Sequence, residues 1–97
     1  MKALDFDWDR RMAAANARKH GVTFEEARTA FFDENAMVFF DPDHSDDEDR
    51  FILLGLSFRL RALVVCHCFR QTETSIRIIS ARTANRAEER AYWETRK

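Results

Sequence analysis

The most constraining feature of the sequence is a succession of three apolar, strand-like runs at residues 50–58, 62–70 and 75–81, joined by very short connections. Strands that follow one another this closely pair antiparallel, because a parallel pair needs a crossover of a dozen or more residues. Each run is apolar on both alternating sets of side chains for most of its length, which predicts a sheet covered in part on both faces. Residues 4–8 and 36–40 are shorter runs that are also predicted to be strands.

Two helices are predicted before these three strands. Asp9 is suited to cap the start of an alanine-rich helix, and Gly21 is suited to end it. Thr23 followed by Glu26 matches the capping box that begins a second helix. The acidic residues of this second helix argue against a DNA-reading helix-turn-helix, although the short joint has that shape. The second helix carries one apolar stripe, formed by Phe24, Ala27, Ala30 and Phe31.

A third helix is predicted after the last strand, because Asn85 with Glu88 signals a helix start and the pattern continues to about Thr95. A chain of 97 residues is the size of one domain. We therefore expect a single compact α+β domain over residues 1–97, with a small antiparallel sheet, two N-terminal helices and one C-terminal helix. No apolar run is long enough to span a bilayer, and we expect a cytoplasmic location.

The net charge of −1 hides a strong asymmetry between the two halves of the chain. Residues 1–49 hold 6 Lys and Arg against 13 Asp and Glu, whereas residues 50–97 hold 10 against 4. A basic half suggests that a polyanion or an acidic protein binds there. The alternative is that the two halves neutralise each other within the folded domain, and charge by itself leaves both interpretations open.

Two segments contain metal-ligating residue types, but neither has the spacing of a common metal site. Cys66 and Cys68 are one residue apart, point the same way from a strand and lack a second pair of ligands, so we expect free thiols. The acidic loop at residues 41–49 would need glycine at its sixth position and glutamate at its twelfth to act as an EF-hand. Those positions hold Asp46 and Ile52, which favours a solvated acidic turn.

His20 and His67 are the candidates for acid–base chemistry, because imidazole exchanges protons near neutral pH. His67 shares its strand face with apolar residues, where a histidine is more often a hydrogen-bonded core residue than a catalyst. The residues alone leave both roles open for each histidine.

Five arginines in the basic half are suited to hold a phosphate, since a guanidinium keeps its charge and presents a bidentate fork. Arg77 and Arg82 are an odd number of residues apart, so on an uninterrupted strand only Arg77 is expected at a sheet-face site. Arg82 is then expected near the start of the last helix, beside Arg86 and Arg90. The alternative is that these arginines form ion pairs with acidic residues. The five are Arg50, Arg77, Arg82, Arg86 and Arg90.

Several blocks of the sequence resemble the BrnT toxin family, in order and with similar spacing over nearly the whole chain. The two most specific blocks are residues 19–27, which read KHGVTFEEA, and residues 76–82, which read IRIISAR. The resemblance implies a compact α+β fold similar to that of RelE-type toxins. Further matching positions are Trp8, Asp9, Asn16, Phe32, Asp33, Glu48, Arg50, Phe51, Gly55, Val64, Val65, Glu89 and Tyr92.

The same resemblance implies a ribonuclease toxin of a bacterial type II toxin–antitoxin pair, which blocks translation by cutting RNA. The implied partners are RNA and a BrnA-like antitoxin, whose ribbon-helix-helix portion binds operator DNA so that an oligomeric complex represses its own operon. No metal or organic cofactor and no membrane partner is implied.

Candidate roles follow from the resemblance together with the chemistry of the matched residues. Acid–base chemistry is assigned to His20 and His67. RNA binding outside the catalytic group is assigned to Arg86, Arg90 and Tyr92. The candidate phosphate or transition-state cations are Lys19, Arg50, Arg77 and Arg82.

One departure from the family pattern bears on activity. Family members often carry Pro and Lys shortly after the Trp-Asp pair, and this chain has Arg10 and Met12 at those positions. If that lysine contributes to cleavage, this chain is weakly active or inactive. Two hypotheses therefore stand: a metal-independent endoribonuclease toxin, and a non-catalytic module that binds the antitoxin and acts as a corepressor.

Overall fold

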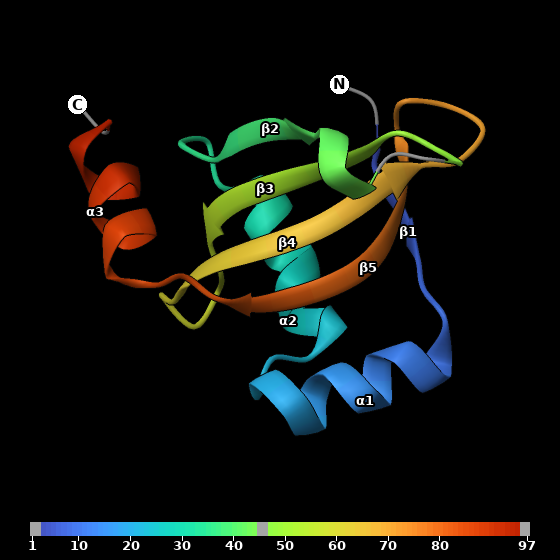
Figure 1. Ribbon diagram of the computed structural model, residues 1–97, viewed down its shortest axis with the longest axis horizontal. Helices are drawn as coiled ribbons and strands as arrows, with labels where there is room; N and C mark the ends of the chain where they lie inside the picture. The colour runs from blue at the N-terminus through green and yellow to red at the C-terminus, as the bar shows by residue number, and fades with distance from the viewer. Residues whose placement is uncertain (1–2, 45–46, 96–97) are drawn as a thin grey trace.

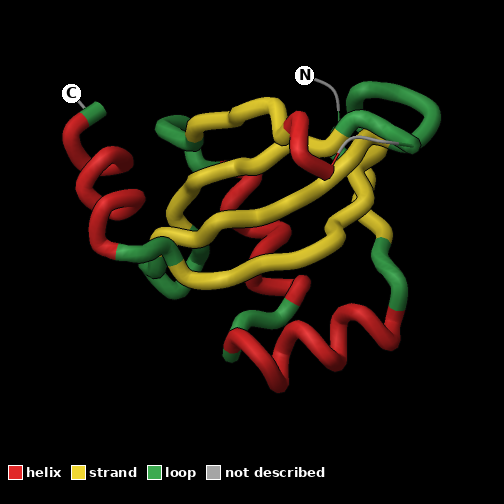
Figure 2. Tube along the Cα trace, in the orientation of Figure 1, coloured by secondary structure: helices red, strands yellow, loops and turns green. Residues whose placement is uncertain are grey.

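The structure is a computed structural model that describes residues 3–44 and 47–95. A curved sheet forms the centre of the molecule, with helices on one side and at one end (Figures 1 and 2). Two short 3-10 segments, η1 (Ala30–Phe32) and η2 (Pro42–His44), lie in the connections. The strands and helices in chain order are β1 (Asp5–Asp7), α1 (Arg10–His20), α2 (Phe24–Thr29), β2 (Met37–Asp41), β3 (Arg50–Leu56), β4 (Ala62–Phe69), β5 (Ser75–Thr83) and α3 (Arg86–Glu94).

The five strands form one sheet in the order β1-β5-β4-β3-β2. The neighbours from β2 to β5 pair antiparallel, as their short connections predict. β1 instead pairs parallel to β5, because the chain returns to it only after α1, α2 and three other strands. The α+β class with two N-terminal helices and one C-terminal helix is confirmed, and the predicted antiparallel sheet is a mixed one.

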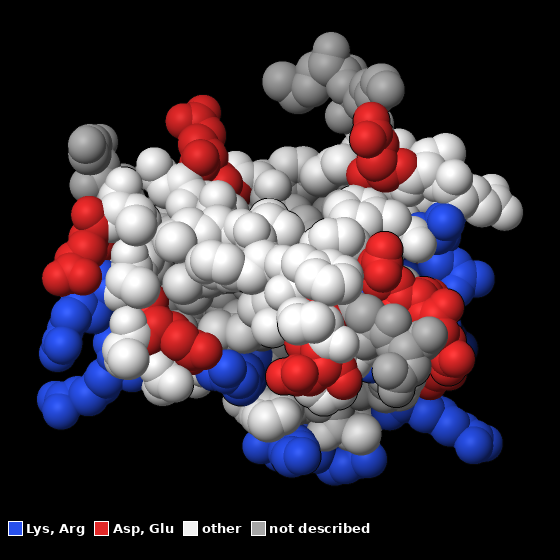
Figure 3. All heavy atoms as spheres, turned by 45° about the horizontal axis from the view of Figure 1, so that its top comes forward, with Lys and Arg blue, Asp and Glu red and all other residues white. Residues whose placement is uncertain are grey.

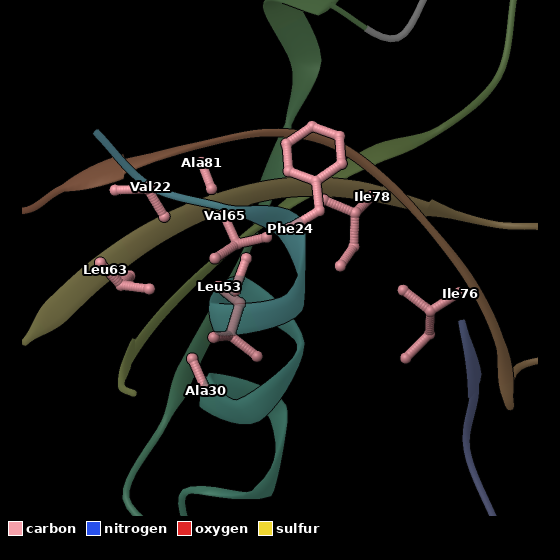
Figure 4. Packing of buried hydrophobic residues seen from close by; sticks show 10 residues of the cluster. Val22, Phe24, Ala30, Leu53, Leu63, Val65, Ile76, Ile78 and Ala81 are labelled. Carbon is pink, nitrogen blue, oxygen red and sulfur yellow. The ribbon is translucent and has the colours of Figure 1, made fainter. Parts of the chain in front are cut away.

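The two faces of the sheet have different surroundings. The helix face, which carries Leu53, Val65 and Ile78, packs against α1 and α2 and contains the main core. Figure 4 shows Phe24 and Ala30 of α2 and η1 directed onto these strand residues. The other face, called the open face here, carries Ile52, Leu54 and Val64, and α3 covers only one end of it.

The helix ends follow the sequence signals closely. The Asp9 carboxylate accepts from the N–H groups of Arg11 and Met12, and Gly21 ends α1 with a φ of 68°. Asn85 and Glu88 form a complete capping box at the start of α3. No helix among the described residues is long and apolar enough to cross a membrane.

The capping box predicted for α2 is only half formed. Thr23 Oγ1 accepts the Glu26 N–H at 3.0 Å, but the Glu26 carboxylate turns away from the helix start. It accepts from Ser57 Oγ at 2.7 Å and from the guanidinium of Arg61. Arg61 also donates to the Gly21 carbonyl at 3.1 Å, so this buried group joins the α1–α2 turn to the β3–β4 turn. The hydrogen bond from Arg61 holds the pKa of Glu26 below its usual range.

Asn16 joins α1 to the free edge of β5. Its side-chain nitrogen donates to the carbonyl oxygens of Ala81 at 2.8 Å and Val22 at 2.9 Å, and its side-chain oxygen accepts from the Ala81 N–H at 3.0 Å. β1 pairs only with residues 75–77 of β5, so no described strand continues along this edge. The buried amide of Asn16 therefore satisfies backbone groups that another strand would otherwise satisfy.

Replacing Asn16 with alanine should lower the free energy of unfolding by about 3 kcal/mol, because buried N–H and C=O groups lose their partners. The measurement is urea unfolding followed by circular dichroism. Arg18→Ala on the exposed side of the same helix is the control, and its effect should stay within about 0.5 kcal/mol. Equal losses in the two variants would contradict the role assigned to Asn16.

Candidate functional site

Strand β5 contains a β-bulge in the middle of the IRIISAR block. On β4 the adjacent residues Cys66 and His67 pair with Ser80 and Ile78, so Ile79 has no partner across the ladder. A bulge inserts one residue into the alternation of side chains between the two faces. Each residue of β5 after Ile79 therefore points to the face opposite to the one that regular alternation would give it.

The bulge places Arg77 and Arg82 on the same face of the sheet. Arg77 lies opposite Cys68 and Arg82 lies opposite Val64, and both partners belong to the open-face set of β4. The expectation that the two arginines leave opposite faces is wrong, because it assumed a regular strand. The strand also continues through Arg82 to Thr83.

A pocket of about 390 Å³ lies on the open face. The end of α1, the segment η2 and strands β3, β4 and β5 all contribute to its wall. The Asn16 contact positions one wall, because it fixes the last turn of α1 beside β5. The polar residues that line the pocket are His20, Asp41, His44, Arg50, Cys66, Ser80 and Arg82.

His44 and Asp41 form a pair at this pocket that the sequence reasoning did not single out. His44 Nδ1 lies 2.9 Å from Asp41 Oδ2, and the Asp41 side chain is largely buried while His44 is exposed. A carboxylate on Nδ1 fixes the imidazole orientation and directs Nε2 outward. The three-residue spacing within the acidic loop was the available signal, but the loop was interpreted as a solvated turn.

Arg50 and Arg82 supply the positive charge of the pocket. Arg50 begins β3 and lies opposite Asp41 on β2 and Cys68 on β4. Arg82 donates through both terminal nitrogens to the two carboxylate oxygens of Glu88, each at 2.8 Å. The ion-pair alternative is thus realised for Arg82, and the pair also joins β5 to the first turn of α3.

Arg77 lies farther along β5, beside β1. Its guanidinium is 3.3 Å from the Asp7 carboxylate, and Asp7 is its register partner on β1. Arg77 does not line the pocket that contains His20 and Arg50. It therefore lies on the open face, paired with Asp7, outside the central group.

A second, shallower hollow adjoins the pocket on the α1 side. The two hollows share the lining residues His20, Ile79 and Ser80, so they are neighbours, and together they are called the depression here. Lys19 and Met12 line the second hollow. Met12 occupies the position that often holds lysine in the BrnT pattern. In this chain an uncharged side chain therefore lines the hollow next to His20.

Comparison with known proteins identifies the family of this chain. The profile of the family described as the ribonuclease toxin BrnT of type II toxin–antitoxin systems matches residues 8–88. The chain belongs to the BrnT ribonuclease toxin family. A type II toxin of this family acts on RNA and is paired with an antitoxin.

One solved structure similar to this BrnT-family chain is the 1.1 Å crystal structure of the Brucella abortus ribonuclease toxin BrnT. Its TM-score is 0.64 at 22% sequence identity, and the match covers 87% of this chain and 100% of that one. At this level of identity the likeness establishes the shared fold. No curated protein matches the chain.

The structure separates His67 from the other candidate residues of this BrnT-family chain. His67 is 1% exposed on the helix face, and its Nδ1 lies 3.2 Å from the Val65 carbonyl. The ring packs against Phe31 at a centroid distance of 4.8 Å, with Phe51 and Phe69 also in contact. Burial lowers the pKa of His67, because the apolar surroundings disfavour the charged imidazolium.

Tyr92 has no surface on which a base of RNA could stack. It is fully buried, and its hydroxyl donates to Asp33 Oδ2 at 2.5 Å, an oxygen that also accepts the Leu56 N–H at 2.8 Å. Tyr92 therefore anchors α3 to the sheet. The neighbouring Trp93 is 46% exposed and lines a hollow on α3 with Arg86, Glu89 and Arg90.

In the part of the chain that the structure describes, the cysteines and the acidic loop show no arrangement for metal binding. Cys66 and Cys68 are free, and burial raises the pKa of both thiols, which favours their protonated form. Within residues 3–44 and 47–95, no group of three or more His, Cys, Asp and Glu side chains is placed to hold a metal ion. Ser45 and Asp46 of the acidic loop lie outside the described residues.

Replacing His67 with phenylalanine should preserve ribonuclease activity, since the new ring keeps the aromatic packing and the imidazole faces away from the pocket. Cleavage of total cellular RNA by the purified protein measures this effect. The folded state of the variant is checked by its thermal unfolding transition. Loss of cleavage in a variant with an unchanged unfolding transition would return His67 to the list of acid–base candidates.

Proposed function

We propose that the open-face pocket is the RNA-cleaving site of this toxin. The observation that carries the proposal is the convergence on one pocket of two histidines, His20 and His44, with Arg50 and Arg82. RNA cleavage by the 2′-hydroxyl needs a proton acceptor, a proton donor and cations around a doubly charged phosphorane. The pocket supplies each of these groups from this chain.

His44 is the proposed general base and His20 the general acid. Asp41 holds His44 Nδ1, which leaves Nε2 to remove the proton from the 2′-hydroxyl of the RNA. The 2′-oxygen forms a bond to phosphorus, and the bond from phosphorus to the 5′-oxygen breaks. His20 gives a proton to that leaving oxygen, so the products are a 2′,3′-cyclic phosphate and a free 5′-hydroxyl.

The arginines bind and neutralise the phosphate in this scheme. Arg50 contributes a charge that persists at every physiological pH, and Arg82 lines the same pocket. In this scheme Lys19 in the adjoining hollow and Arg77 beside β1 contact neighbouring phosphates. Arg86 and Arg90 on α3 would extend this contact, with Trp93 in the stacking role first assigned to Tyr92.

Replacing Arg50 with alanine, or His44 or His20 with asparagine, should reduce cleavage about 100-fold or more, because each variant loses a proton-transfer group or a transition-state charge. The rates are measured on a fluorescently labelled single-stranded RNA in the presence of EDTA.

Arg59→Ala is the matched control for these variants, because Arg59 is an exposed arginine at the β3–β4 turn and does not line the pocket. Its rate should equal that of the wild type. Full activity of Arg50→Ala and of both histidine variants would refute the site, and loss of all cleavage in EDTA would refute the proposed metal independence.

Met12 supports a second candidate function, a catalytically weak antitoxin-binding corepressor. Met12 lines the hollow next to His20, where it provides no charge for a phosphate. Arg82 is at the same time neutralised by Glu88. Both features lower the positive potential of the depression.

Replacing Met12 with lysine should raise cleavage about tenfold if the depression lacks a phosphate-binding charge, which corresponds to about 1.4 kcal/mol of transition-state stabilisation. Met12→Gln is the control, because it has a similar length and no charge. Equal rates for the two variants would show that a lysine at this position does not contribute. The same labelled RNA serves as substrate.

The proposed biological setting is a single domain over residues 1–97 that acts with a BrnA-like antitoxin. In this proposal the antitoxin blocks the toxin and carries the ribbon-helix-helix portion that binds operator DNA, and the oligomeric complex represses the operon. The family match supports an antitoxin partner in general terms. Binding of the complex to its own promoter fragment, compared with binding of the antitoxin alone, tests the corepressor role.

A further inference from the structure

Strand β2 forms an exposed edge of the sheet. It pairs with β3 only, and no other described strand lies on its outer side. An edge strand offers unpaired backbone N–H and C=O groups to any extended chain that comes alongside it. Such edges usually carry charged residues, proline or a bulge that prevents pairing.

The side chains of β2 do not protect this edge. Val38, Phe39 and Phe40 are consecutive and are 55%, 48% and 51% exposed. Their register partners place Phe39 on the open face, and Val38 and Phe40 on the helix face. Both faces beside the edge are therefore apolar, and about half of each of these side chains is open to solvent.

The apolar surface continues inward from the edge along the helix face. The Phe40 ring contacts Phe51 at a centroid distance of 5.7 Å, and Phe51 contacts Phe69 at 5.4 Å. Phe69 is itself 36% exposed. A chain that pairs with β2 would thus find an aromatic surface beside it, so side chains on one of its faces would also be buried.

Acidic residues lie at both ends of this edge. Exposed Glu34 precedes β2, and the acidic loop follows it with exposed residues Asp43, Asp47, Glu48 and Asp49. Figure 3 turns the β2 side of the molecule forward and shows a wide uncharged area with Asp and Glu side chains around it. The edge is therefore an apolar centre between two negative ends.

This charge pattern selects one occupant. A second copy paired antiparallel through β2 would bring the Glu34 end of one molecule to the Asp43 end of the other, and like charges repel. RNA would find no Lys or Arg on β2 to hold its phosphates. An extended protein segment with apolar side chains in the centre and Lys or Arg at its ends is complementary in all three parts.

We propose that the β2 edge binds an extended, basic-ended segment of the antitoxin, which adds a strand to the sheet. This inference rests on the antitoxin partnership of the proposed function, and it does not depend on the catalytic roles. It also gives a reason for the unprotected edge, since a permanent partner removes the risk of aggregation.

The test uses the full toxin and the protein encoded beside its gene, which is the expected antitoxin. The dissociation constant of the complex is measured for the wild-type toxin and for its Phe40→Lys and Val38→Lys variants. Each variant should weaken the complex about 30-fold or more, as expected when a charge enters an apolar contact at the centre of an interface. Phe58→Lys, at a residue 69% exposed on the β3–β4 turn, is the control and should bind as the wild type does. Both kinds of variant are at exposed positions, and thermal unfolding checks that they fold.

Two further measurements identify the occupant. Hydrogen exchange of the β2 amides should slow in the complex, and Glu34→Lys should weaken binding mainly at low salt because it removes a charge attraction.

Wild-type affinity of Phe40→Lys for the antitoxin would overturn the inference while leaving the toxin–antitoxin pairing intact. The inference would also be overturned if the free toxin formed a dimer that Phe40→Lys separates, since the occupant would then be a second copy. It would be overturned in favour of RNA if Phe40→Lys, and no control variant, reduced the affinity for RNA. Failure of the wild-type toxin to bind the neighbouring protein would refute the pairing itself and, with it, this inference.

Discussion

The contact on which the rest of the site depends is the side-chain amide of Asn16 on the edge of β5. β1 covers only the beginning of that edge, so the later part would expose backbone groups of a core strand. The Asn16 amide replaces the missing strand at Ala81 and also binds the Val22 carbonyl at the start of α2. One side chain thus fixes the last turn of α1, and with it His20 at the wall of the pocket.

The β-bulge at Ile79 is the second constraint, because it determines on which face of the sheet the charge of Arg82 lies. Without it, Arg82 would point toward the helix face, where burying an unpaired guanidinium is costly. With it, Arg82 reaches the open face and binds Glu88, which also caps α3. The same ion pair that positions Arg82 neutralises it, so the positive potential of the pocket depends on how a phosphate competes with Glu88.

Much of the fold could be predicted because its signals are local. The caps at Asp9, Thr23 and Asn85 and the glycine at Gly21 depend on backbone groups within a few residues, and each is found as the sequence predicts. The antiparallel strands follow from their short connections. The Glu26 prediction was half wrong for the opposite reason, since the partners of its carboxylate are 31 and 35 residues away.

The sequence by itself determined the family, the α+β class, the strand and helix boundaries to within a few residues, and the candidate status of His20, Arg50 and Arg82. Only the tertiary structure decided which candidates meet. It buried His67 and Tyr92, brought His44 and Asp41 into the pocket, and left β2 as an apolar edge. The reason is that helix caps and strand periodicity act over a few residues, whereas face, burial and strand order depend on a bulge and on packing between distant segments.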